Sequence, residues 1–143
     1  FQEIREKRGL AYDIGSHFTG YRDTGLFTIS GGTGLETYGQ VIELVHAEME
    51  KVAAEGLTAD ELSQAKRRLR GLMVFGQESM AQRMLSVGRS MLLLDRVVPL
   101  DEVLEQIEAV TNDDIVSVGE EVFRDGNEAI VALGPFRKNG GVQ

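Results

Sequence analysis

Residues 1–12 read Phe1-Gln2-Glu3-Ile4-Arg5-Glu6-Lys7-Arg8-Gly9-Leu10-Ala11-Tyr12. The spacing of Phe1 and Ile4, with charges on the other faces, predicts the last turns of a helix. Gly9 is expected to end this helix in the left-handed conformation that glycine adopts freely. A strand then opens at Leu10, so that Arg5 and Tyr12 flank the break as two polar residues able to reach a substrate. The rest of the chain is interpreted as scaffold around this corner.

The composition is that of one folded domain. The chain has 143 residues, of which 42% are hydrophobic, and it has no apolar run long enough to cross a membrane. The absence of cysteine excludes disulfides, thiolate metal sites and a cysteine nucleophile, and it fits a reducing compartment. A net charge of −8 argues against nucleic acid as the main partner. Together these features favour a cytoplasmic location.

Two alternating stretches predict an antiparallel hairpin. Residues 11–21 and 26–30 are rich in aromatic and β-branched residues, and the polar run 22–25 forms the turn between them. Strict alternation places Tyr12 on one face with Ile14, Ser16 and Phe18, as expected for a tyrosine in a core. A further short strand is expected at residues 129–133.

Between these strands, apolar residues repeat at helical spacing and predict five helices. Capping boxes are expected at Thr33 with Glu36 and at Thr58 with Glu61, while Thr111, with Asp114 three residues on, starts the last helix. The order of elements predicts an α+β fold of two layers, with a mostly antiparallel sheet covered by helices on one face. The domain is expected to span residues 1–136 and to be followed by a flexible tail, 137–143.

Four patterns suggest sites, and each has an ordinary structural explanation that is favoured. The run 31–34, Gly-Gly-Thr-Gly, could bind phosphate before a helix, but it lacks the P-loop lysine, and a strand-to-helix connection capped by Thr33 explains it. His46 and Glu50 have the spacing of metal ligands, but zinc needs a third ligand, and a solvent-facing pair explains them. The basic run 66–70 is expected to be a solvated face. Four methionines are expected in the core, with an adaptable peptide-binding surface as the alternative: Met73, Met80, Met84 and Met91.

Arg5 and Tyr12 are the remaining candidates. A guanidinium and a phenol that converge could hold a peptide carbonyl, or stabilise the oxyanion that forms when the carbonyl is attacked. On the residues alone, a surface arginine and a core tyrosine are the favoured explanation.

The chain resembles the pitrilysin/insulinase metallopeptidases (inverzincins), which include the mitochondrial processing peptidases. The signature segment is 1–12, and the similarity runs in order to about residue 136. It continues through Asp23-Thr24-Gly25-Leu26-Phe27, Gly32-Thr33, Gly56-Leu57-Thr58, Glu61-Leu62, Ala65-Lys66, Gln77-Glu78-Ser79, Arg83, Gly88-Arg89, Ile107, Ala109-Val110-Thr111 and Ala132-Leu133-Gly134-Pro135.

The resemblance implies an enzyme made of two similar α+β halves that face each other. This chain is similar to most of the C-terminal half, which carries no metal, truncated at its N-terminus. Zinc would be held by an H-x-x-E-H motif and a downstream glutamate in the N-terminal half or in a partner chain, and its bound water would attack the peptide. Arg5 and Tyr12 would reach the peptide, position the scissile carbonyl and help to stabilise the oxyanion.

The motif H-x-x-E-H is absent from this sequence. The chain alone is therefore expected neither to bind catalytic zinc nor to hydrolyse peptides. Its expected partners are the zinc-binding half or subunit and a peptide substrate, with no nucleic acid and no membrane. The resemblance also implies a missing upstream strand, so that an open sheet edge could pair copies of the chain. A non-catalytic subunit or structural core protein of the same family is the alternative function.

Overall fold

The computed structural model describes residues 2–6, 8–124 and 126–135. The described chain runs through a short π-helical turn, η1 (Gln2–Glu6), two strands, β1 (Ala11–Gly20) and β2 (Gly25–Thr33), and then five α-helices. The helices are α1 (Tyr38–Glu55), α2 (Ala59–Gly76), α3 (Met80–Leu94), α4 (Leu100–Ala109) and α5 (Asn112–Val122). The expected tail, 137–143, lies outside the described residues.

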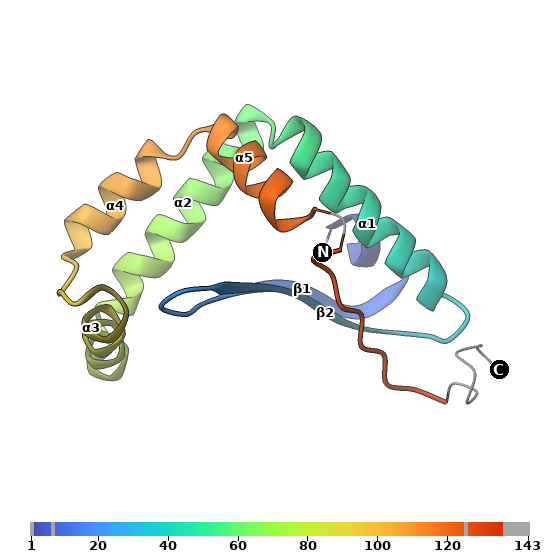
Figure 1. The fold of residues 1–143 in the computed structure, drawn as a ribbon, viewed down its shortest axis with the longest axis horizontal. Helices are drawn as coiled ribbons and strands as arrows, with labels where there is room; N and C mark the ends of the chain where they lie inside the picture. The colour runs from blue at the N-terminus through green and yellow to red at the C-terminus, as the bar shows by residue number, and fades with distance from the viewer. Residues whose placement is uncertain (1, 7, 125, 136–143) are drawn as a thin grey trace.

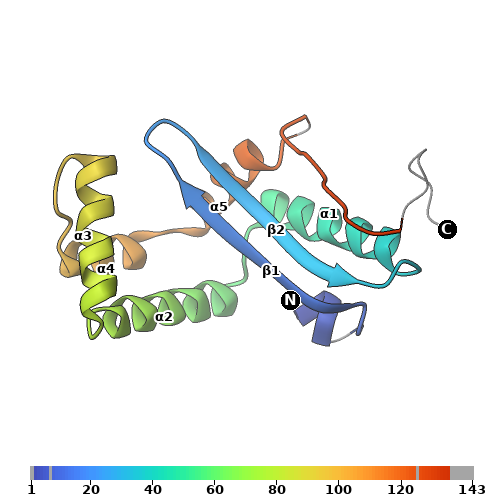
Figure 2. The same cartoon turned by 90° about the horizontal axis from the view of Figure 1, so that it is seen from below.

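The two strands form an antiparallel hairpin, as the alternating pattern predicted. Its register pairs Gly20 with Gly25 beside the turn and Ile14 with Gly31 near the other end. Gly31 allows a close approach of the strands, because a Cβ there would lie only 2.7 Å from the backbone oxygen of Asp13. Figure 2 shows the hairpin with the helices on its far side.

The helices α2 and α5 begin where local sequence signals predict them. Thr58 and Glu61 form a reciprocal capping box, in which each side chain accepts a hydrogen bond from the backbone N–H of the other residue. Thr111 and Asp114 form the same arrangement at the start of α5. Hydrogen bonds from the Thr111 hydroxyl and backbone lower the pKa of Asp114 below its usual range.

Figure 1 shows the helices as an arch over one side of the hairpin, with α1 and α5 side by side and α3 beyond the hairpin turn. A small core fills the base of this arch, where the buried residues are Ile4, Ala11, Ile14 and Val41. The helices α1 and α5 approach closely because of Gly119, whose Cβ, if present, would lie 3.0 Å from the Cα of Ala53. This arrangement confirms an α+β fold with helices on one face of an antiparallel sheet.

The turn between α1 and α2 is attached to the start of α5. Gly56 ends α1 with φ of 68°, a backbone conformation that favours glycine. The side chain of Asn112 accepts a hydrogen bond from the backbone N–H of Leu57 at 2.7 Å and donates one to the carbonyl of Glu55 at 3.1 Å. The amide therefore satisfies polar groups that the end of α1 leaves unpaired.

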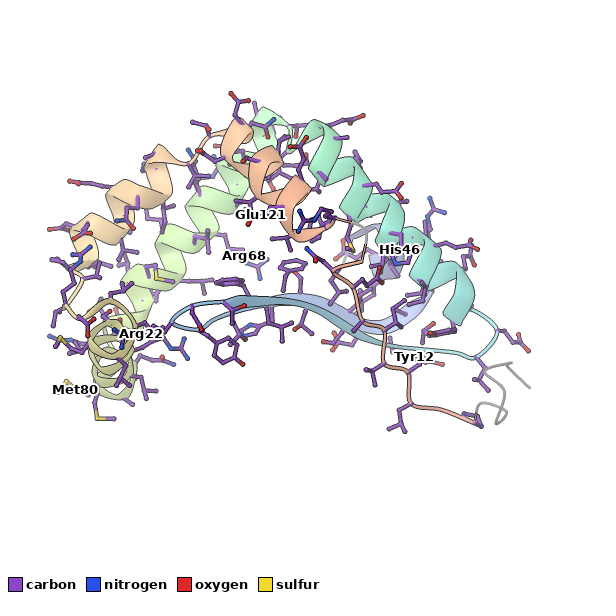
Figure 3. All side chains as sticks on the ribbon, in the orientation of Figure 1. Tyr12, Arg22, His46, Arg68, Met80 and Glu121 are labelled. Carbon is purple, nitrogen blue, oxygen red and sulfur yellow. The ribbon has the colours of Figure 1, made fainter. Side chains whose placement is uncertain are left out.

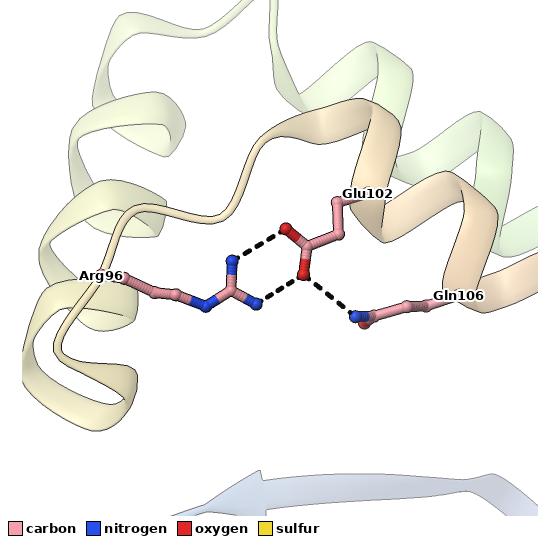
Figure 4. A network of polar contacts seen from close by, with 3 residues as sticks. All are labelled: Arg96, Glu102 and Gln106. Atoms are coloured by element: carbon pink, nitrogen blue, oxygen red, sulfur yellow. Dashed lines mark hydrogen bonds and ion pairs between the residues drawn. The ribbon is translucent and has the colours of Figure 1, made fainter.

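Polar contacts connect α4 to the loop that precedes it and to α2. Arg96, between α3 and α4, donates two hydrogen bonds to the carboxylate of Glu102, one of them at 2.8 Å, and Gln106 donates a third at 3.2 Å (Figure 4). The hydrogen bonds from Arg96 lower the pKa of Glu102. Lys66 on α2 donates to the backbone carbonyl of Glu108 at 2.7 Å, near the C-terminal end of α4.

Three predictions about these elements are wrong. Residues 129–133 form no strand, since they lie extended without pairing, and Val131 is 95% exposed. Thr33 does not cap α1, because its hydroxyl bonds elsewhere and Thr37 occupies the cap position. The methionines do not fill a core within the described chain: their exposed fractions run from 38% to 76% for Met73, Met80, Met84 and Met91. No helix in the described ranges is long and apolar enough to cross a membrane.

Candidate functional site

The corner between η1 and β1 is built by a left-handed glycine. Gly9 has φ of 63°, and its backbone N–H donates to the carbonyl of Arg5 at 3.0 Å. The next N–H, of Leu10, donates to the carbonyl of Ile4 at 2.9 Å. These bonds close the end of the helical turn as a C-cap does, and the sequence predicted this role for Gly9. The side chain of Ile4 is buried, whereas that of Arg5 is exposed.

Tyr12 lies at an irregularity in the strand pairing. Ala11 pairs with Thr33 and Asp13 pairs with Gly32, so that Tyr12 is an extra residue on β1. This β-bulge places two exposed residues between the buried side chains of Ala11 and Ile14. Tyr12 is 83% exposed, on the side of the sheet away from α1 (Figure 3). The expectation that Tyr12 shares a face with Ile14 is therefore wrong, because the bulge shifts the alternation.

Hydroxyl groups attach the corner to the start of α1. The hydroxyl of Thr33 donates to the backbone carbonyl of Leu10 at 2.5 Å and lies 2.8 Å from the hydroxyl of Thr37. Since the Thr33 hydroxyl gives its single hydrogen to Leu10, it can only accept from Thr37, whose own hydroxyl hydrogen is shared with the Gly34 carbonyl at 3.1 Å. Residues 23 positions apart are thus fixed together immediately before Tyr12.

A hollow of about 470 Å³ opens beside Tyr12. It is lined by residues 9–12 on one side and 34–37 on the other. Its walls come from the two segments that the threonine contacts join, and the exposed phenol stands at its edge. This corner is the place where the described chain offers an exposed aromatic group, an exposed cation and a concave surface close together in sequence.

The other candidate sites have structural explanations. The imidazole of His46 lies 2.8 Å from the carboxylate of Glu128, not beside a second ligand, and the described residues contain no group of three side chains suited to a metal (His46 is labelled in Figure 3). Gly31 and Gly32 belong to β2 rather than to a phosphate loop. In the basic run, Lys66 and Arg70 both contact Glu108.

Reasoning from the sequence missed the bulge at Tyr12 and the role of the two threonines. The paired glycines at 31 and 32 were the available signal, since glycine within a strand often marks a bulge or a close backbone approach. Thr37 gave no signal, because its function depends on a residue on another element.

Comparisons with known proteins agree on one family. A family model described as the peptidase M16 inactive domain matches residues 1–69. An uncharacterized zinc protease of Streptomyces coelicolor is 35% identical over 137 residues, covering 96% of this chain and 30% of the relative. The uncharacterized zinc protease YmxG of Bacillus subtilis is 30% identical, covering 94% of this chain and 33% of the relative. The chain therefore spans about a third of the length of these relatives.

Solved structures agree on the fold. The periplasmic protease PqqL from Escherichia coli matches 82% of this chain and 13% of its own, with a TM-score of 0.65 and 18% identity. A conserved protein from Enterococcus faecalis matches 84% of this chain and 28% of its own, with a TM-score of 0.71 and 22% identity.

Proposed function

The chain belongs to the peptidase M16 family, and from this premise we propose that it is the substrate-binding C-terminal domain of a zinc-dependent endopeptidase. The resemblance to the pitrilysin/insulinase peptidases is thereby confirmed at the level of the family and of its inactive domain. The proposal adds a role for the corner at residues 5–12.

The described residues do not fit a zinc site. They contain no cluster of three metal-ligating side chains, and His46 is paired with Glu128. The matched family model is itself described as inactive. In the proposal, zinc is held by another part of the protein or by a partner chain, and this domain contributes peptide binding.

The observation that carries the proposed role is the bulge at Tyr12. A regular strand would direct this side chain towards the sheet face that holds Ile14, whereas the bulge leaves the phenol 83% exposed beside a hollow. Bulges are common next to active sites, where they change the direction of a side chain. The phenol O–H and the guanidinium of Arg5 are both donors, suited to a peptide carbonyl and to the oxyanion derived from it.

The test uses the full-length, zinc-loaded protein. Tyr12→Phe and Arg5→Ala should each lower kcat/KM by an amount corresponding to about 2–4 kcal/mol in the barrier, as expected for loss of an oxyanion donor. Tyr21→Phe is the matched control, because Tyr21 is an exposed tyrosine at the other end of the same hairpin. Unchanged kinetics in both variants would sink the assignment.

The alternative is a non-catalytic subunit or a structural core protein of the same family. The two functions differ in the part of the protein that lies beyond this chain. An intact H-x-x-E-H motif there, together with measurable peptide hydrolysis, supports the peptidase. A full-length protein without the motif, which gains no activity when mixed with a zinc-bearing relative, supports the alternative.

A further inference from the structure

Large apolar side chains on α2 and α3 lie exposed along one arm of the arch. Their exposed fractions run from 56% to 76%. We call this group the apolar arm; its members are Leu72, Phe75, Met80, Met84, Leu85 and Leu92. So many large apolar side chains left uncovered on neighbouring helices of a folded protein mark an interaction site.

The exposed surface area of the chain indicates how large a covering partner has to be. The chain has a mass of 15.7 kDa and exposes 11259 Å². A folded monomer of this mass exposes about 7300 Å², which leaves an excess of roughly 4000 Å². A partner in a standard complex loses about 800 Å², and even an obligate dimer rarely buries more than about 2500 Å² on each copy. This excess belongs to the whole chain, with the hairpin and residues 126–135 included, and it is larger than one dimer interface accounts for.

The charge of the arm also disfavours a second copy. Residues 59–94 carry six basic and three acidic residues, a net charge of +3, within a chain whose total is −8. A two-fold dimer through the arm would place like charges opposite each other. A covering surface that is apolar with acidic residues fits the arm better.

Arg68 indicates where the covering surface would place one of its acidic residues. It precedes Leu72 by four residues and Phe75 by seven, so all three share a face of α2. Figure 3 shows Arg68 on the side of α2 that faces the hairpin. The described residues provide it with no ion pair, unlike Arg70, which lies 3.8 Å from Glu108.

We propose that the apolar arm is covered within the same polypeptide, by a segment outside these 143 residues that is apolar at its centre and places a carboxylate opposite Arg68. The relatives support a continuous chain as the source, since about two thirds of their length lies outside the matched part. The arm is then an internal interface of the protein rather than a docking site for a free partner.

Methionine oxidation in the full-length protein tests this inference. Met80 and Met84 are 76% and 68% exposed here, and exposed thioethers react with dilute peroxide. Mass spectrometry should find both oxidised several-fold more slowly in the native protein than in the same protein in urea, at every protein concentration. Native rates that approach those in urea would overturn the proposal. So would protection that disappears on dilution, because it would identify a second copy as the cover.

A charge reversal tests the carboxylate. Arg68→Glu should lower the Tm of the full-length protein more than Arg67→Glu does, because the partner of Arg67 among the described residues is Ser63 on its own helix. Equal shifts in Tm for the two variants would contradict the proposed carboxylate opposite Arg68. Neither measurement uses peptidase activity, so a failure here is distinct from a failure of the proposed function.

Discussion

The helices of the base and of the apolar arm have similar amphipathic patterns, but their apolar side chains are buried in the base and exposed in the arm. In the base, α1 packs against α5, and its Val41, 8% exposed, shares a buried cluster with Ala11 and Ile14 of the hairpin. In the arm, α2 and α3 have the same kind of amphipathic pattern, but Phe75 is 70% exposed. The difference shows that helical periodicity predicts which face of a helix is buried. It does not predict which other part of the protein covers that face.

The substitution Phe75→Ala in the full-length protein tests most directly whether the apolar arm is buried as the base is. If the arm is covered, the truncation should lower the free energy of unfolding by about 3 kcal/mol, because it leaves a cavity. Urea unfolding followed by circular dichroism measures the loss. Val41→Ala in the base provides the scale for a position that is already buried. A change within about 0.5 kcal/mol, as for ordinary surface substitutions, would mean that the arm stays exposed.

Gly56→Ala probes the base itself. A Cβ at this position would lie 2.3 Å from the side-chain oxygen of Asn112, and φ of 68° disfavours any side chain. The variant should lose about 2 kcal/mol in the same unfolding experiment, since it adds backbone strain and displaces the Asn112 hydrogen bonds.

The control for Gly56→Ala is Gly39→Ala on the same helix, where a Cβ meets nothing within 4 Å. That change should stabilise the protein by up to about 1 kcal/mol, because alanine favours the helix. Equal effects of the two substitutions would contradict the described packing between α1 and α5.

Thr33→Val examines the contact that holds the corner before Tyr12. Loss of the hydroxyl leaves the Leu10 carbonyl without this donor and should lower the free energy of unfolding by about 1 kcal/mol. Thr33→Ser keeps the hydroxyl and should behave almost as the native protein does. If Val and Ser are equivalent in both stability and kcat/KM, the threonine contact has no part in positioning Tyr12.

The smallest expected effect is the pH dependence contributed by Glu102. Its pKa is lowered in the folded state by hydrogen bonds from Arg96, so the folded protein favours the carboxylate form. The stabilisation is complete above the ordinary carboxyl pKa of about 4 and is lost as the pH falls through the lowered folded value. Glu102→Gln should flatten this part of the plot of Tm against pH.

Two helix starts were read correctly from the sequence, because both partners of each cap lie within one turn of helix. The capping boxes at Thr58 and Thr111 need only a spacing of three residues, and both are present. Thr33 had the same spacing to Glu36, but its hydroxyl donates to Leu10, a residue 23 positions away that no local pattern reveals.

Features that depend on a neighbouring strand could not be predicted from local patterns. The apolar residues of 129–133 have the composition of a strand, yet a strand requires a paired edge, and none of the described strands pairs with them. The direction of Tyr12 likewise depends on how β1 is paired with β2. Arg5 and Tyr12 were identified through family resemblance, and their joint action on a peptide remains a prediction.

Side chains along a strand alternate between the two faces with a period of two residues. The bulge at Tyr12 shifts this alternation by one residue. Residues on either side of it keep their buried partners, because the shift is absorbed within a single step. Removing Tyr12 itself would restore the phase and leave the hairpin intact while deleting the outward phenol. A one-residue gap at position 12 in an aligned relative therefore distinguishes proteins that keep the exposed tyrosine from proteins that keep only the scaffold.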